Sequence, residues 1–308
     1  MTEDLSAALV DSFDAVFGVH SGVRAAHAKG TSCDAMFTST PAASGLTSAA
    51  HMQGASIPAT VRFSNGSGDP GAADSGREPR GMSVKFHLPE GRDTDIVAIN
   101  QPVFIVRTPQ EFLEFMHLRV RDPATGQPDI AGLMAFVAAR PESQVAAQIL
   151  LNAPPIASFF RAPYYAIHAF RWVAADKTER FVRYRWAPSL GEETLSIEDA
   201  GARSADYLRE DLLVRLSAAP ASFSLHVQIA SGEDDPADPT TIWPDDRETV
   251  HVGDLTVTRP VADQQAVESM IFDPMRMCPG IKPSKDPILA ARARAYLVSA
   301  DRRNATER

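Results

Sequence analysis

The segment SFSLHVQIA, residues 222–230, shows the alternation that decides the fold class. Phe223, Leu225, Val227 and Ile229 are apolar, and polar residues stand between them. Because successive side chains of a β-strand point to opposite faces, this pattern predicts a strand with one buried face and one polar face. Such strands are typical of antiparallel sheets, since parallel sheets are usually buried on both faces.

The same alternation recurs in SVKFHL (83–88) and FVRYRW (181–186). These segments belong to two strand-rich regions, about 57–107 and 166–258, which are separated by helical patterns and show no βαβ rhythm. We therefore expect an α+β fold. It should be a single domain over residues 1–308, with an antiparallel sheet or barrel and helices packed outside it.

Helical periodicity appears in several regions between and around the strands. These regions are 3–17, 109–119, 130–151, 205–218 and 263–271.

A last helix is expected over residues 286–303, because Asp286 suits the N-cap, Pro287 suits the first helical position, and an Ala-rich body follows. One face of this helix carries residues spaced by three, four and seven positions. They are Leu289, Arg292, Tyr296 and Arg303. Taken alone, this pattern is typical of an amphipathic helix whose tyrosine covers the core and whose arginines face solvent.

Composition limits the classes of partner. The 308 residues are 44% hydrophobic and 22% charged, as in a globular protein with a sizeable core. A net charge of −9 argues against nucleic acid or an anionic membrane surface and favours small molecules. No apolar run reaches the ~18 residues of a membrane span, and the acidic N-terminal segment is unlike a secretory signal, so we expect a cytoplasmic protein.

Several common site motifs do not occur in the sequence. Cys33 and Cys278 lie far apart and outside any C-x-x-C pair, so they indicate buried thiols and neither a disulfide scaffold nor a zinc site. The sequence contains no phosphate-binding G-x-x-x-x-G-K-[ST], no G-x-S-x-G and no H-E-x-x-H.

The segment RAAHAKGTSCDAMF, residues 24–37, is more informative. His27 alone would be typical of a core or loop histidine, but the segment resembles the R-x-x-H-A-K-G segment of haem catalases. Further segments resemble that family in order along most of the chain. They are VRFSNGSGD (61–69), REPRGMSVKF (77–86), DIVAINQPVFIVRTPQEF (95–112), TIWP (241–244) and FDPMRMCPGIKPSKDPILAARARAY (272–296). The resemblance implies a catalase-like antiparallel β-barrel with surrounding helices, and haem b between the barrel and the C-terminal helix.

The resemblance gives the face of the last helix a role in holding the cofactor. Tyr296 would be the axial ligand of the haem iron, as a phenolate. Arg292, one turn earlier, would donate to the phenolate oxygen as a cation that keeps its proton. Arg303, Arg24 and Arg62 would pair with the haem propionates.

On the opposite face of the haem, the resemblance assigns proton transfer to His27. It would act first as general base and then as general acid on the hydroperoxide. Ser64 would orient the imidazole and fix its tautomer. Phe104 and Phe112 would line the apolar pocket.

Two positions depart from the family pattern. Ile99 stands where catalases carry a distal asparagine, and Ala26 stands where they carry a valine. Asn100 is one residue away, and in a strand a shift of one residue points the side chain to the other face, so we do not assign it the missing role. These departures predict weak dismutation of hydrogen peroxide and a preference for bulkier organic hydroperoxides, reduced with electrons from an organic donor.

The sequence also has no counterpart of the long N-terminal arm and the helical C-terminal region of full-length catalases, so we expect wider access to the haem. These features together resemble the catalase-related peroxidases. The alternatives are a true minimal catalase, a haem carrier or sensor, and a haem-free barrel that binds an apolar ligand. An allene oxide synthase-type lyase is a further alternative, but that branch carries threonine where this chain has Ala26. A homo-oligomer and a nicotinamide cofactor are left open.

Overall fold

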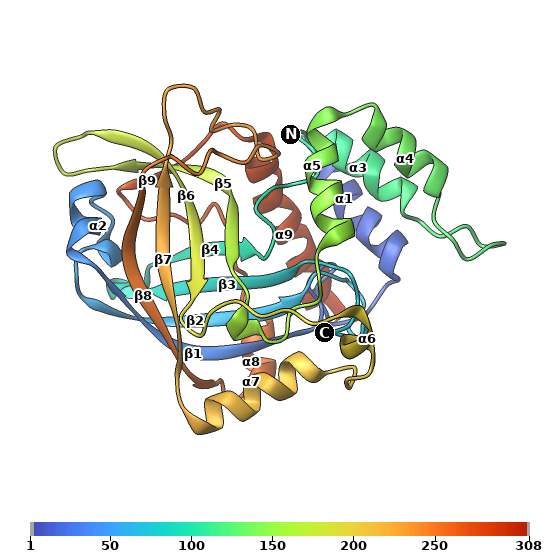
Figure 1. Ribbon diagram of the computed structural model, residues 1–308, viewed down its shortest axis with the longest axis horizontal. Helices are drawn as coiled ribbons and strands as arrows, with labels where there is room; N and C mark the ends of the chain where they lie inside the picture. Colours follow the sequence, from blue (N-terminus) through green and yellow to red (C-terminus); the bar gives the residue numbers. More distant parts are fainter. Residues whose placement is uncertain (1–2, 307–308) are drawn as a thin grey trace.

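The computed structural model describes residues 3–306, and within them eight antiparallel strands close into a barrel (Figure 1). Their order is β4-β3-β2-β1-β8-β7-β6-β5, and the pairing of Ile99 in β4 with Tyr165 in β5 closes the sheet. The short strand β9 pairs with β5 further along, at Phe170–Trp172. The predicted α+β fold with an antiparallel barrel is confirmed.

The strands are β1 (Gly30–Ser39), β2 (Ser56–Asn65), β3 (Arg80–His87), β4 (Asp93–Ile99), β5 (Tyr164–Val173), β6 (Glu179–Pro188), β7 (Ala221–Ile229), β8 (Thr249–Pro260) and β9 (Ile281–Pro283). The helices are α1 (Glu3–Phe17), α2 (Pro41–Leu46), α3 (Pro109–Leu118), α4 (Ile130–Ala138), α5 (Pro141–Asn152), α6 (Ile197–Gly201), α7 (Tyr207–Ala218), α8 (Gln264–Glu268) and α9 (Pro287–Thr306). Three short 3-10 turns, η1 (Ala50–Met52), η2 (Pro89–Gly91) and η3 (Phe159–Arg161), complete the described elements.

The barrel interior is filled by the apolar face of each strand. In β7, Phe223, Leu225 and Val227 are fully buried, whereas the alternate residues Ser224 and His226 are half-buried. This is the alternation that the sequence shows. The opposite face of the strands is therefore free to carry polar groups.

Helices group on one side of the barrel. Figure 1 shows α1, α3, α4 and α5 together, with α9 running between this group and the barrel wall. Both α1 and α3 contact α9, and α7 packs against β8. No helix within residues 3–306 has the length and apolar character needed to cross a membrane.

The last helix begins where the sequence predicts it. The Asp286 carboxylate accepts hydrogen bonds from the backbone N–H groups of Ile288 at 2.8 Å and Leu289 at 3.3 Å, which caps α9. The helix runs to Thr306, beyond the predicted end at residue 303.

Two predicted boundaries are wrong, and one strand was not predicted. The single helix expected over 130–151 is divided into α4 and α5, because Pro141 disfavours helical geometry at the residue before it and starts a new helix. Strand structure in region 57–107 ends at Ile99, ahead of Pro102. Strand β1 was not predicted, although its burial alternates from Cys33 to Ser39, because the sequence of these residues does not alternate cleanly: Ala35, Met36 and Phe37 are apolar in succession.

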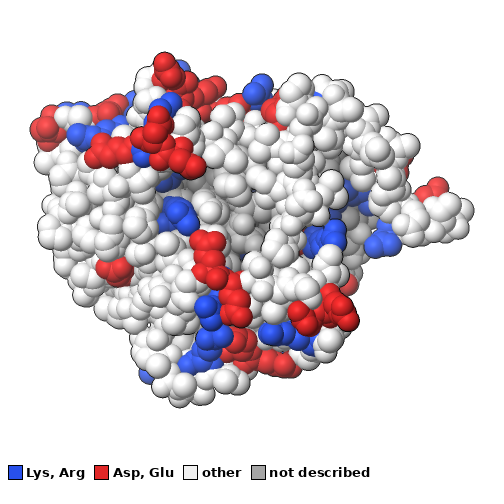
Figure 2. Space-filling view, in the orientation of Figure 1, with Lys and Arg blue, Asp and Glu red and all other residues white. Residues whose placement is uncertain are grey.

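Two further predicted regions contain more or less regular structure than expected. Region 166–258 also contains the short helix α6, which was not predicted, as well as α7, which matches the helix expected over 205–218. The helix expected over 263–271 is confined to α8. The acidic, Pro-rich segment 231–246 forms a loop between β7 and β8. Figure 2 shows acidic side chains gathered along that edge of the molecule.

Candidate active site

A cavity of about 380 Å³ lies between the outer face of the barrel and the helices α1, α3 and α9. Its size falls in the range of ligand pockets. Every residue that the sequence assigned to the haem site lines this one cavity. These residues are Arg24, His27, Arg62, Ser64, Phe104, Phe112, Arg292, Tyr296 and Arg303.

The floor of the cavity is the outer face of β2, β3 and β4. Ser64 lies opposite Gly81 in β3, and Gly81 lies opposite Ile99 in β4, so the three residues form one cross-strand row. Arg62 precedes Ser64 by two positions and faces the same side. The intervening Phe63 points into the barrel core and is fully buried.

His27 lies over this row in a left-handed backbone conformation, with φ +57°. A Cβ at Gly81 would lie only 2.9 Å from Nδ1 of His27 and 2.6 Å from Oγ of Ser64, so only glycine leaves room for the imidazole. The backbone N–H of His27 donates to the carbonyl of Gly66 at 3.4 Å, and Arg62 donates to the carbonyl of His27 at 2.9 Å. A non-glycine residue in this conformation is strained and needs such support.

The imidazole of His27 is held on one side only. Nδ1 lies 3.0 Å from Oγ of Ser64, and within the described chain Nε2 has no hydrogen-bond partner. Burial, with the charge of Arg62 next in importance, lowers the pKa of His27 to about 3. The ring is therefore neutral near pH 7, with one nitrogen available to a ligand.

A second group of side chains surrounds the phenol of Tyr296. Arg292 donates to the Tyr296 oxygen through Nε at 3.1 Å and through Nη2 at 2.7 Å. Its third nitrogen lies 2.8 Å from Nε2 of His168, whose Nδ1 lies 2.6 Å from a carboxylate oxygen of Asp286. Because Arg292 can only donate, Nε2 of His168 must accept, which puts the imidazole proton on Nδ1 toward Asp286.

His168 and Asp286 are nearly fully buried, and burial lowers the pKa of His168. His168 was not predicted as a site residue, and Asp286 was predicted only as a helix cap. The only sequence signal for this contact was the position of Asp286, six residues before Arg292 at the start of the same helix.

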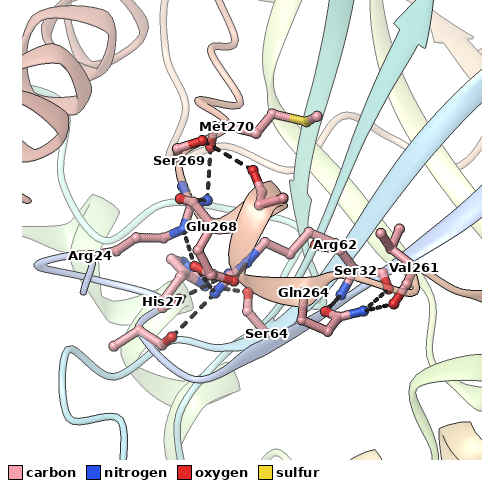
Figure 3. Close-up of polar contacts among 12 residues, drawn as sticks. Arg24, His27, Ser32, Arg62, Ser64, Val261, Gln264, Glu268, Ser269 and Met270 are labelled. Carbon is pink, nitrogen blue, oxygen red and sulfur yellow. Dashed lines mark hydrogen bonds and ion pairs between the residues drawn. The ribbon is translucent and has the colours of Figure 1, made fainter. Parts of the chain in front are cut away.

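A third group, shown in Figure 3, gathers arginines around one glutamate. The Glu268 carboxylate lies 3.3 Å from Nε of Arg24 and 3.1 Å from Nε of Arg62. Arg24 also donates to the carbonyl of Met270 at 2.8 Å, and Arg303 donates to the carbonyl of Ser269 at 3.3 Å. The guanidinium groups of Arg24 and Arg62 thus share one carboxylate, so two positive charges face one negative charge at this end of the cavity.

These charges perturb one another. Burial, reinforced by the charge of Arg62, lowers the pKa of Arg24 to about 9. Burial raises the pKa of Glu268, but the charges of Arg62 and Arg24 outweigh it, and the net pKa is lowered. Glu268 therefore stays ionised between the two arginines. The sequence analysis did not identify Glu268, because nothing local distinguishes it from a surface glutamate of a short helix.

The remaining wall of the cavity is aromatic. The Phe112 ring centroid lies 5.2 Å from that of Phe104 and 5.8 Å from that of Phe13 in α1. Phe17, the last residue of α1, also lines the cavity. The contribution of α1 was not predicted, although Phe13 and Phe17 stand four positions apart on one helical face.

The donor set fits haem. A tyrosine oxygen held by two N–H groups of Arg292 is suited to carry negative charge, and phenolate is a known axial ligand of haem iron. The surplus of guanidinium groups around Glu268 suits propionates, and the aromatic walls suit a porphyrin. The fold and the cavity thus define a barrel protein with a site of the haem-binding class.

Comparison with known proteins gives the family. Residues 21–307 match the catalase family model. The chain is 38% identical to a catalase-related peroxidase of Mycolicibacterium paratuberculosis, over 97% of this chain and 95% of that protein. It is 33% identical to a catalase-related peroxidase of Synechococcus elongatus, over 96% of this chain and 87% of that protein. The chain belongs to the catalase family, and within it to the catalase-related peroxidases.

Full-length catalases share the fold but are longer. The catalase of Cavia porcellus is 33% identical over 89% of this chain, which corresponds to 54% of that protein. The crystal structure of a fungal catalase superposes with a TM-score of 0.83 at 27% identity, covering 91% of this chain and 59% of that one. A bacterial catalase gives a TM-score of 0.84 at 28% identity, covering 91% of this chain and 57% of that one. Proteins of this family bind haem.

Proposed function

We propose that this protein is a haem b peroxidase that reduces organic hydroperoxides with electrons from an organic donor and dismutates hydrogen peroxide only weakly. The observation that supports this proposal best is Ile99. It lies in the same cross-strand row as Ser64 and faces the cavity of His27, where a polar side chain could position a second peroxide. An aliphatic side chain there offers no hydrogen bond and favours an apolar substrate.

The proton transfers belong to His27. Its neutral imidazole takes the proton from the hydroperoxide O–H and later delivers it to the alkoxide oxygen that leaves when the O–O bond breaks. Ser64 keeps Nδ1 occupied, so Nε2 faces the substrate. Bound haem supplies the electrons that cleave the O–O bond, and the organic donor restores them.

Tyr296 would hold the haem iron as a phenolate, whose negative charge needs a stabilising partner. Arg292 provides two hydrogen bonds from a cation that does not release its proton. His168 and Asp286 hold the third nitrogen of Arg292 and so fix the plane of the guanidinium group.

The walls of the cavity favour bulky substrates. Ala26 lines the cavity with a single methyl group, and the aromatic rings of α1 and α3 exclude water from the path to His27. Arg24, Arg62 and Arg303 would hold the haem propionates at the edge, with Glu268 fixing the first two guanidinium groups.

The test compares two activities of the purified holoprotein per haem. One is the oxidation of a peroxidase dye with cumene hydroperoxide, and the other is oxygen evolution from hydrogen peroxide. We expect the first to exceed the second. Rapid oxygen evolution without any reduction of cumene hydroperoxide would identify a true minimal catalase and contradict the proposal.

A further inference from the structure

Arg119, the C-cap residue of α3, forms no ion pair with any residue that the structure describes. It lines the same cavity as His27. Its guanidinium carbon lies 5.5 Å from the ring centroid of Phe17 and 5.7 Å from that of Phe115. Nη1 contacts the sulfur of Met116 at 3.6 Å, and within residues 3–306 no carboxylate forms an ion pair with Arg119.

The carboxylate that influences Arg119 most is that of Glu78, which also lines the cavity. Glu78 forms an ion pair with Arg80, in which Oε1 lies 3.6 Å from Nη1, and among the described residues this buried oxygen has no hydrogen-bond partner. Burial lowers the pKa of Arg119, and only the charge of Glu78 opposes this effect. The Arg119 cation is therefore poorly solvated, and an additional anion beside it would be stabilising.

Arg119 lies close to the segment that carries His27. Phe17, over whose ring the guanidinium group lies, packs against Gly68, and a Cβ at Gly68 would also meet the carbonyl of Ala25, two residues before His27. Phe112 and Phe115 of α3, with Phe13 and Phe17 of α1, supply apolar walls to this part of the cavity. Their side chains form one chain of ring contacts, Phe17–Phe13–Phe112–Phe115. One cavity thus combines a proton-transfer pair, aromatic walls and an unpaired cation.

We propose that Arg119 binds the carboxylate of the substrate, and that the preferred substrates are hydroperoxides of long-chain fatty acids. This inference rests on the proposed function and names its substrate class. The acyl chain would lie against the phenylalanine rings, with the hydroperoxide group at His27 and the carboxylate on the guanidinium group. A purely structural Arg119, favourable at a helix C-terminus and stacked on two rings, would not distinguish an acid from its ester.

The experiment measures steady-state kinetics of the holoprotein with three substrates: a linoleic acid hydroperoxide, its methyl ester and cumene hydroperoxide. In Arg119→Gln we expect KM for the acid to rise roughly tenfold or more, with kcat unchanged, because one charge-assisted pair is lost. The ester and cumene hydroperoxide should be unaffected. Arg119→Lys should retain part of the preference for the acid. Arg121→Gln is the matched control, since Arg121 is exposed and donates only to the carbonyl of Gly126.

A calorimetric titration with linoleate and methyl linoleate separates this inference from the proposed function, because it needs no turnover. We expect linoleate to bind the wild type more tightly than Arg119→Gln, and methyl linoleate to bind both equally. This result would support a carboxylate site at Arg119 even in a protein that reduces no organic hydroperoxide. If Arg119→Gln changes KM and the binding affinity equally for the acid and the ester, the proposed carboxylate site is wrong. In that case reduction of cumene hydroperoxide would still support the proposed function.

Discussion

Arg62 donates a hydrogen bond to the backbone carbonyl of His27 at 2.9 Å and is itself held by Glu268 at 3.1 Å. The loop that carries His27 is thus fixed by a side chain of β2, and that side chain is fixed by the short helix α8. Because His27 has a positive φ, its backbone conformation depends on these contacts from distant segments. Arg62 also belongs to the arginines proposed to hold the haem propionates. Binding of haem and orientation of the His27 imidazole therefore depend on the same side chain.

His27→Asn should lower kcat for hydroperoxide reduction by about 10²–10⁴-fold, the usual contribution of a general acid–base. Asparagine tolerates the left-handed backbone at this position, so the fold and the haem content should persist. Ser64→Ala should cost about tenfold, since it removes only the group that orients the imidazole. Steady-state kinetics and the haem absorption spectrum are the measurements. Full activity of His27→Asn with haem bound would exclude the assigned role.

Tyr296→Phe removes the phenol oxygen and leaves two N–H groups of Arg292 without their acceptor. We expect the variant to fold, to bind haem weakly or with a changed absorption spectrum, and to lack peroxidase activity. Tyr165→Phe, in the barrel wall, is the control and should keep the wild-type spectrum. An unchanged haem spectrum in Tyr296→Phe would show that the iron has a different axial ligand.

Ile99→Asn places an amide in the cross-strand row of Ser64 and Gly81. The amide can hydrogen-bond hydrogen peroxide, so oxygen evolution per haem should rise while the rate with cumene hydroperoxide falls. The ratio of the two rates is the quantity to measure. A ratio that does not move would mean that position 99 does not set the preference between the substrates.

Glu268→Gln keeps the size of the side chain but leaves Arg24 and Arg62 without a carboxylate. We expect the free energy of unfolding to fall by about 1–3 kcal/mol, measured by denaturant titration, because three charge-assisted hydrogen bonds weaken. The activity should fall as well, since Arg62 supports His27. Glu192→Gln is the control. It removes an exposed ion pair with Arg185 and should cost less than about 1 kcal/mol.

His51 provides a test by pH. Burial lowers its pKa from 6.5 to about 3, so the folded state keeps it neutral where the unfolded chain binds a proton. Its contribution to stability is therefore complete above pH 6.5 and is lost as the pH falls from 6.5 toward 3. His51→Gln should reduce the slope of unfolding free energy against pH in this window by up to about 1.4 kcal/mol per pH unit. His117→Gln, at an exposed position, is the control variant. If the slope of unfolding free energy against pH is the same in the wild type, His51→Gln and His117→Gln, the folded state does not keep His51 neutral.

The sequence by itself determined the antiparallel strands, the capped last helix and the face that carries Arg292 and Tyr296. Each of these depends on periodicity or on capping between near neighbours, which consecutive residues specify directly. The resemblance to catalases added His27, Ser64 and the three arginines. All of these residues line one cavity in the structure.

Only the tertiary structure decided which groups support those residues. His168 meets Arg292 across 124 positions of sequence, and Glu268 meets Arg62 across 206. Closure of the barrel sets these pairs through the register of every intervening strand. Nothing in the sequence distinguishes Arg119 from other helix-terminal arginines, and only the packing of α1 against α3 places it beside Phe17 and the cavity. Local patterns fix which face a side chain occupies, but its partner on another element is fixed only when the whole sheet has closed.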